Sequence, residues 1–145
     1  MKRKVSIIVV IVAFPLILYL IYNNTLNKKD NAFDTETLLT EMNSFNTEYS
    51  VDKSAKRDLF SVAPTMIFLG TDKLSVYEYR NIKSMEKDAA RISSDGYQIG
   101  NNKVSWALEP HFFKKGKILV QYCGGNKKTF DLLEKILGKQ FAGSK

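Results

Sequence analysis

The stretch TMIFLGTDKLSVYEYR, residues 65–80, decides the fold of this chain. It contains two apolar runs, Met66–Leu69 and Leu74–Tyr79, on either side of the polar segment Gly70–Lys73. Short apolar runs separated by a few glycine-bearing residues are typical of a β-hairpin, here with a four-residue loop. Because side chains alternate along a strand, we expect the even-numbered residues of the second run on one face of a sheet and the odd-numbered ones on the other.

Three helical patterns surround this hairpin. The segment Phe33–Asn46 carries apolar residues at spacings of four and three, with Asp34 as its N-cap, and residues 81–92 repeat this pattern behind Asn81. A third apolar stripe occupies the segment 126–138, with Asn126 as its N-cap and a glycine at its end. Each stripe predicts a helix with one face packed on a core.

Three further segments read as strands. Residues 49–51 form a short one, and Val104–Glu109 alternates large apolar residues with small or polar ones, as in a half-buried strand. Lys117–Cys123 is more continuously apolar, which is typical of a central strand covered on both faces. The expected order is α-β-β-β-α-β-β-α. It predicts an α+β fold with one antiparallel-rich sheet and the helices packed on one face.

The N-terminus predicts the location of the protein. Residues 5–22 are uncharged and largely apolar, and 18 residues of helix span about 27 Å, close to the hydrocarbon thickness of a bilayer. A cleaved signal peptide is the alternative, but its apolar region is usually shorter and ends in small residues that are lacking here. We therefore expect an uncleaved transmembrane signal anchor.

Charge sets the expected orientation of this anchor. The basic residues within 1–4 hold the N-terminus in the cytoplasm, so the chain beyond the span is expected outside it. Residues 23–33 read as a short tether, and residues 34–143 as one extracytoplasmic α+β domain at the plasma membrane.

Composition excludes some classes of function. The formal net charge is +7, but Lys2, Arg3 and Lys4 carry three of these charges and the segment 28–30 one more, which leaves +3 on residues 31–145. Such a mild excess does not predict nucleic-acid binding, which rests on a dense basic surface. The single cysteine, Cys123, excludes an internal disulfide, and no Cys/His cluster predicts a metal site or any cofactor.

The run EPHFFKKGK, residues 109–117, contains the only histidine. The simplest interpretation is a hairpin connection that leads into the strand Lys117–Cys123, because Gly116 suits a turn. The alternative is an interfacial foot, in which aromatic rings enter the lipid and lysines meet anionic headgroups. The residues of this candidate membrane or partner contact are His111, Phe112, Phe113, Lys114, Lys115 and Lys117.

A catalytic role for His111 stays open as a third interpretation. Cys123 or a carboxylate would have to lie within hydrogen-bonding reach of the imidazole. Cys123 ends an apolar strand, where a cysteine is usually a small buried hydrophobe of low reactivity. The run CGGNKKT, residues 123–129, joins a strand to a helix but lacks the spacing of a phosphate-binding loop.

Several short motifs together resemble an uncharacterised family of small exported proteins of Gram-positive bacteria, which often carry a lipid anchor. The resemblance covers residues 40–143 and rests on Phe60–Val62, Tyr77–Tyr79, Glu86–Ala89, Arg91–Ser93, Asp95–Tyr97, Ile99–Asn101, Trp106, Pro110–Phe112, Lys114–Gly116 and Gly138–Gly143. It implies a cell-envelope location and no known activity, substrate or catalytic residue. This chain departs from the family in its plain anchor without a lipidation cysteine.

The expected function is accordingly general. We expect a membrane-anchored extracytoplasmic module that binds an envelope protein, the wall polymer or the membrane surface, and is not an enzyme. The alternative is a small envelope hydrolase that uses His111 with Cys123 or a nearby carboxylate.

Overall fold

The structure is a computed structural model that describes Leu18 and residues 33–144. The expected anchor and tether lie outside the described residues, apart from Leu18 and Phe33. Within the described part of the chain, no helix combines the length and the apolar character needed to cross a membrane.

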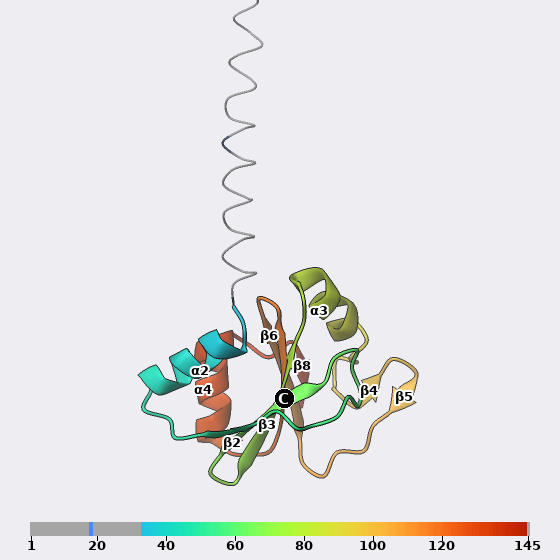
Figure 1. Cartoon of the computed structure of the whole chain (residues 1–145). Coiled ribbons are helices and arrows are strands. Elements are labelled where there is room, and N and C mark those ends of the chain that lie inside the picture. The colour runs from blue at the N-terminus through green and yellow to red at the C-terminus, as the bar shows by residue number, and fades with distance from the viewer. Residues whose placement is uncertain (1–17, 19–32, 145) are drawn as a thin grey trace, which may run out of the picture.

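The domain is α+β, with an antiparallel six-stranded sheet in the order β1-β2-β3-β7-β6-β8 (Figure 1). Its strands are β1 Ser50–Asp52, β2 Pro64–Leu69, β3 Asp72–Glu78, β6 Pro110–Lys115, β7 Ile118–Cys123 and β8 Ala142–Gly143. A separate hairpin consists of β4 Gln98–Ile99 and β5 Asn102–Lys103. The helices are α2 Thr35–Ser44, α3 Ile82–Ala89 and α4 Lys127–Leu137. The α+β class and the antiparallel sheet are confirmed.

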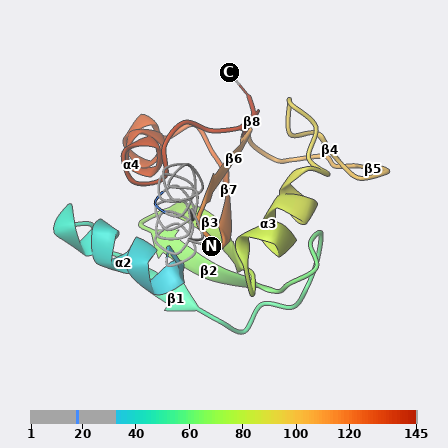
Figure 2. The ribbon, with the colours of Figure 1, turned by 90° about the horizontal axis from the view of Figure 1, so that it is seen from above.

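Helices cover both faces of the sheet, so the expectation that they pack on one face is wrong. Figure 2 shows α2 and α4 on one side of the sheet and α3 on the other. Leu74 and Val76 belong to the core under α2 and α4, whereas Tyr77 and Tyr79 belong to the core under α3. The predicted alternation along this strand is therefore confirmed. Because both of its faces are apolar, each requires a covering layer.

The predicted N-caps are confirmed in all three described helices. The side chains of Asp34, Asn81 and Asn126 accept the backbone N–H groups of residues 37, 84 and 128 at 2.9, 2.9 and 3.1 Å. Each bond satisfies a donor that the first helical turn leaves without a partner. The helix starts were therefore readable from the sequence.

The β2–β3 connection is tighter than predicted. Leu69 pairs with Asp72, so the turn consists of Gly70 and Thr71 alone instead of four residues. Gly70 adopts a φ of 60°, a left-handed conformation that glycine reaches without steric cost. The apolar runs marked the strands, but polar Asp72 and Lys73 also join the ladder.

The strand predicted at Val104–Glu109 is wrong, and this segment is a loop between β5 and β6. Strand pairing begins only at Pro110. Most of the run 109–117, which was predicted to be a hairpin connection, therefore forms strand β6, and the turn consists of Gly116 and Lys117 alone. Val104 and Trp106 still pack on the core of the α3 face. Their alternation therefore reflects contacts of a loop, not strand geometry.

Strand β7 is central, as predicted, with β3 on one side and β6 on the other. Strand β8 was not foreseen. It pairs with β6 through His111 opposite Gly143 and Phe112 opposite Ala142, and thereby closes that edge of the sheet.

Candidate ligand-binding cleft

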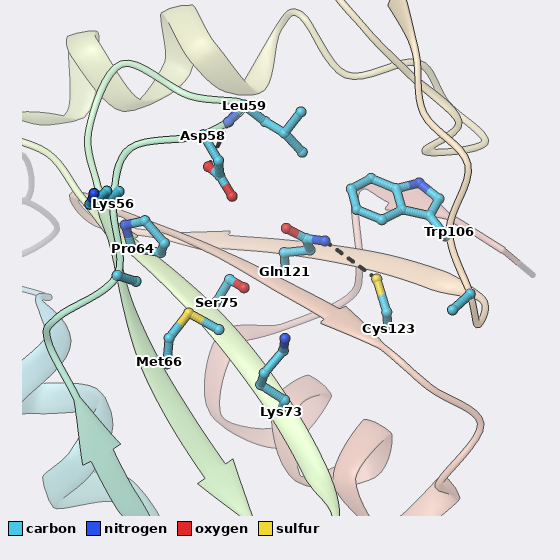
Figure 3. A pocket seen from close by; sticks show the side chains of 12 residues that line it. Lys56, Asp58, Leu59, Pro64, Met66, Lys73, Ser75, Trp106, Gln121 and Cys123 are labelled. Carbon is cyan, nitrogen blue, oxygen red and sulfur yellow. Dashed lines mark hydrogen bonds between the residues drawn. The ribbon is translucent and has the colours of Figure 1, made fainter.

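A cleft of about 400 Å³ lies on the face of the sheet that α3 covers, beyond the part that the helix itself occupies. Its floor comes from β2, β3 and β7, and its walls come from the loop before β2 and the loop before β6 (Figure 3). The lining residues are Ala55, Lys56, Asp58, Leu59, Pro64, Met66, Lys73, Ser75, Trp106, Ala107, Gln121 and Cys123. The volume is within the range of small-molecule sites in proteins.

Hydrogen bonds to the core hold the first wall, residues 53–63. The phenol of Tyr77, which is fully buried in β3, donates to the Asp58 carboxylate at 3.1 Å. Three residues further along the chain, the backbone N–H of Ser61 donates to Asp88 of α3 at 2.7 Å. The loop is thus held by both the sheet and α3 although it contains no strand or helix.

Asp88 is 5% exposed and carries a charge that its surroundings compensate. Its carboxylate accepts the Ser61 N–H, the Tyr79 hydroxyl at 3.1 Å and an Arg91 guanidinium nitrogen at 3.0 Å. Burial acts to raise the pKa of Asp88, but the hydrogen bonds from Ser61, Arg91 and Tyr79 outweigh burial and hold the pKa below its usual value. The carboxylate is therefore ionised near neutral pH.

The second wall is the Trp106 side chain. Its indole N–H donates to the Gly96 carbonyl at 2.8 Å, and its ring meets the Phe112 ring edge-on at a centroid distance of 6.1 Å. The polar end of the indole is therefore satisfied, and the remaining ring surface lines the cleft as an apolar wall.

The floor carries a chain of polar groups. The Tyr77 hydroxyl also lies 3.4 Å from Oε1 of Gln121, whose amide nitrogen donates to Sγ of Cys123 at 3.3 Å. Burial, and then the charge of Asp58, raises the pKa of Tyr77, so its phenol stays protonated and remains a donor. Burial also raises the pKa of the Cys123 thiol, which keeps it in the neutral form and disfavours nucleophilic chemistry.

Two lysines supply the positive charge of the cleft, and Asp58 supplies a negative one. Lys56 stands on the loop wall and Lys73 on β3, and neither forms an ion pair within the part of the chain that the structure describes. Figure 3 shows Lys73 and Asp58 at opposite ends of the cleft, with Ser75 and Gln121 between them. The described lining therefore combines two ammonium groups without an ion pair, the Asp58 carboxylate that accepts the Tyr77 hydroxyl, and the Trp106 ring.

His111 and Cys123 do not come together. The imidazole stacks on Tyr122 and contacts Phe130 on the side of α4, whereas Cys123 lines the cleft on the opposite face of the sheet. A Cys–His pair is therefore not formed in this structure. Glu109 lines the same cavity as His111, but no hydrogen bond joins the two side chains.

Phe112 and Phe113 are both 0% exposed and belong to the two different cores. They cannot enter a lipid surface while the domain is folded, and the structure removes them from the candidate contact surface. The reason is that the run forms a strand, so successive rings point to opposite, covered faces.

The three lysines of the candidate contact surface have partners in the domain. Lys114 pairs with Glu86 at 2.6 Å, and Lys117 pairs with Glu78 at 2.9 Å. The ammonium group of Lys115 donates to the Ile136 carbonyl at 2.7 Å. Membrane or partner contact through His111 and these lysines stays a prediction.

No group of three potential metal-ligating side chains occurs within residues 33–144. Comparison of the chain with models of known protein families, with curated proteins and with solved structures found no match.

Sequence reasoning did not identify the cleft. Its residues come from the loop 55–59, three strands and the loop around Trp106, and no local motif joins them. The sequence did contain one usable signal. Small or polar residues interrupt strands that are otherwise apolar on both faces, at Ser75, Gln121 and Cys123. Such positions mark the part of a sheet that no helix covers.

Proposed function

We propose that this chain is a membrane-anchored binding module of the bacterial cell envelope whose ligand occupies the cleft. The apolar run 5–22 and the basic residues before it support the anchor, with the N-terminus in the cytoplasm and the domain outside. The expected partner is an envelope protein or the wall polymer, and the ligand would be a part of it that fits the cleft.

The observation that carries the binding proposal is that Lys56 and Lys73, which form no ion pair within the described residues, line the same cleft as the apolar ring of Trp106. Hydrogen bonds to the rest of the domain hold both walls, so the walls need little further ordering when a ligand binds. A ligand with one anionic group and an adjacent apolar group matches this lining. The anion would accept hydrogen bonds from the lysines, and the apolar group would pack against the indole.

The position of the cleft agrees with an anchored module. The chain enters the domain at Phe33, whose carbonyl accepts the Lys117 N–H at 3.1 Å, next to the β6–β7 turn. Glu78 pairs with Ile118 near this turn, while Leu74, next to Lys73, pairs with Tyr122 at the other end of the same strands. At about 3.4 Å per residue, Lys73 lies about 17 Å from Glu78 along β3. The Lys73 end of the cleft is thus remote from the point of chain entry.

Fluorescence of Trp106 tests ligand binding directly, because it is the only tryptophan of the chain. The full chain in lipid nanodiscs would be titrated with N-acetyl-leucine, which joins a carboxylate to an apolar group, and with its neutral amide. We expect the acid to change the Trp106 fluorescence in a saturable way. The amide should bind about tenfold more weakly, because hydrogen bonds to charged groups contribute about 1.5–3 kcal/mol.

Matched variants identify the site. Lys73→Gln should weaken binding of the acid about tenfold. Lys53→Gln changes an exposed lysine of the loop wall that does not line the cleft, and it should leave binding unchanged. Equal binding of acid and amide, or an unaltered affinity in Lys73→Gln, would contradict the proposed ligand chemistry.

Protease added to intact protoplasts tests the location. We expect digestion of the domain while cytosolic markers survive. A protected domain, or a domain released into the medium without residues 1–22, would contradict anchoring with this orientation.

A further inference from the structure

A second cavity, of about 460 Å³, lies on the other face of the sheet, where the start of β6, the first turn of α4 and the C-terminal tail meet. His111, Phe130, Glu109, Lys127, Gly125 and Gln140 line it. It shares no lining residue with the cleft near Trp106. Any ligand of this cavity is therefore independent of the function proposed above.

The tail fixes the tautomer of His111. The side-chain amide nitrogen of Gln140 donates to the Ser144 carbonyl at 2.6 Å, which turns the amide oxygen toward the imidazole. That oxygen lies 2.8 Å from Nδ1 of His111. Since an amide oxygen only accepts, Nδ1 must carry the proton, and in the neutral ring Nε2 has a free lone pair.

This lone pair opens into the cavity. His111 is 7% exposed, yet Nε2 has no hydrogen-bond partner within residues 33–144. Among the fully buried side-chain nitrogens and oxygens of that segment, only Oγ1 of Thr35 lacks a partner, so Nε2 is not sealed in the core. The accessible surface of this nearly buried side chain faces the cavity that it lines.

Aromatic neighbours hold the ring in place. The imidazole stacks on Tyr122 at a centroid distance of 5.8 Å and meets Phe130 edge-on at 4.9 Å. Gly124 allows this arrangement, because a Cβ there would lie 2.5 Å from the Tyr122 hydroxyl. The acceptor atom is thus preorganised, and ordering it on binding costs little.

The geometry points to this cavity as a binding site for a neutral pyranose sugar. A sugar hydroxyl donates to Nε2 of His111, a second hydroxyl reaches the Glu109 carboxylate, and the apolar C–H surface of the ring packs on Phe130. The cavity volume accommodates one or two such rings.

Two other ligand classes fit less well. Lys127 pairs with Asp131 at 2.6 Å, so the described residues that line the cavity offer no unpaired cation to hold an anion. A metal ion would need more ligands than His111 and Glu109, and the described residues contain no group of three.

The single histidine of the chain gives an unambiguous readout. Ring-nitrogen NMR of the ¹⁵N-histidine-labelled full chain in nanodiscs reports the tautomer and hydrogen bonding at Nε2. The probes are methyl β-D-glucopyranoside and N-acetylglucosamine, and tetrahydropyran serves as the same ring without hydroxyls. We expect the Nδ1–H tautomer, and a saturable shift of Nε2 with at least one sugar but not with tetrahydropyran.

Variants of Gly125 localise the binding. A Cβ at Gly125 meets nothing within 4 Å and its φ is not positive, so substitutions there leave the core intact. Gly125→Leu should fill the cavity and weaken sugar binding at least about fivefold, while Gly125→Ala retains most of it. Lys73→Gln should have no effect, which separates this site from the cleft.

Three NMR results would overturn the proposal. These are an Nε2–H tautomer in the free protein, no shift with either sugar at about 100 mM, or equal shifts with sugar and tetrahydropyran. Unchanged affinity in Gly125→Leu would also do so, because the sugar would then bind elsewhere.

Discussion

The carboxylate of Asp88 accepts the backbone N–H of Ser61 at 2.7 Å, a bond that joins α3 to the loop forming one wall of the cleft. The same carboxylate accepts the Tyr79 hydroxyl from the end of β3 and an Arg91 nitrogen. One buried side chain therefore ties together a helix, the sheet and an irregular loop. This junction helps to hold the loop that forms one wall of the cleft.

Asp88→Asn should destabilise the domain by about 1–3 kcal/mol. The amide keeps one acceptor oxygen but presents an N–H₂ group to donors, and it no longer attracts Arg91. Urea unfolding of the full chain in nanodiscs, followed by Trp106 fluorescence, measures this loss. Glu86→Gln on the same helix is the control, because its exposed pair with Lys114 contributes less than about 1 kcal/mol. Equal effects of the two changes would refute the central role of Asp88.

Asp88 also predicts how stability depends on pH. Its pKa in the folded state lies below the ordinary value of 3.8, because the hydrogen bonds that it accepts outweigh the effect of burial. The stabilisation is therefore complete above that ordinary value and is lost as the pH falls through the folded-state pKa. We expect the urea midpoint to drop less between pH 6 and pH 3 in Asp88→Asn than in the native chain. If the urea midpoints of the two proteins fall in parallel with pH, Asp88 does not contribute to the pH dependence of stability.

Local signals in the sequence predicted the local structure. Asp34, Asn81 and Asn126 marked the starts of helices, because a capping bond needs only residues two or three positions apart. Apolar period and turn residues likewise located β2, β3 and β7. These features depend on residues close together in the sequence, so short stretches of sequence are enough to predict them.

Features that depend on distant contacts were missed. Trp106 alternates with small neighbours as a strand residue would, yet its partner is the Gly96 carbonyl and not a neighbouring strand. Strand β8 has only two residues and is identified by its pairing with His111 and Phe112. The cleft combines loops and strands that only the tertiary fold brings together, and short sequence patterns do not encode such proximity.

Phe113→Ala should strongly destabilise the domain rather than weaken contact with lipid. The ring is fully buried between the sheet and α4 and meets Phe130 edge-on at 5.7 Å. Truncation of a buried phenylalanine costs about 3–5 kcal/mol, through lost transfer energy and the cavity left behind. Lys114→Gln, its neighbour in β6, should cost less than about 1 kcal/mol. Thermal or urea unfolding compares them, and a Phe113→Ala variant of native stability would argue against this burial.

Cys123 should react slowly with alkylating agents. Burial raises the pKa of its thiol above the ordinary value of 9.0, so little thiolate exists near neutral pH. The alkylation rate with iodoacetamide should therefore still rise beyond pH 9, and mass spectrometry can follow it because the chain has no other cysteine. A ligand in the cleft should slow the reaction further, since Cys123 lines it. A rate that levels off below pH 8 would indicate an activated thiol and favour the hydrolase alternative.

Gly143→Ala should detach β8 from the sheet. Gly143 has a φ of 126°, and a Cβ there would lie 2.2 Å from the Pro110 carbonyl oxygen, so backbone must move to admit a methyl group. The backbone N–H of Ser144 donates to that same carbonyl, and Gln140, which orients His111, donates to the Ser144 carbonyl. Displacement of the tail should therefore release the imidazole.

Two measurements follow this change separately. Hydrogen exchange should accelerate at the Phe141 and Ser144 amides, which donate to β6, and the ring-nitrogen signals of His111 should move toward a mixture of tautomers. Gly125→Ala, where the added Cβ meets nothing within 4 Å and φ is not positive, provides the matched control and should change neither. If exchange is faster but the Nδ1–H tautomer is unaltered, something other than the Gln140 amide holds the histidine. If Gly143→Ala exchanges at the native rate, the tight pairing of β6 with β8 is refuted.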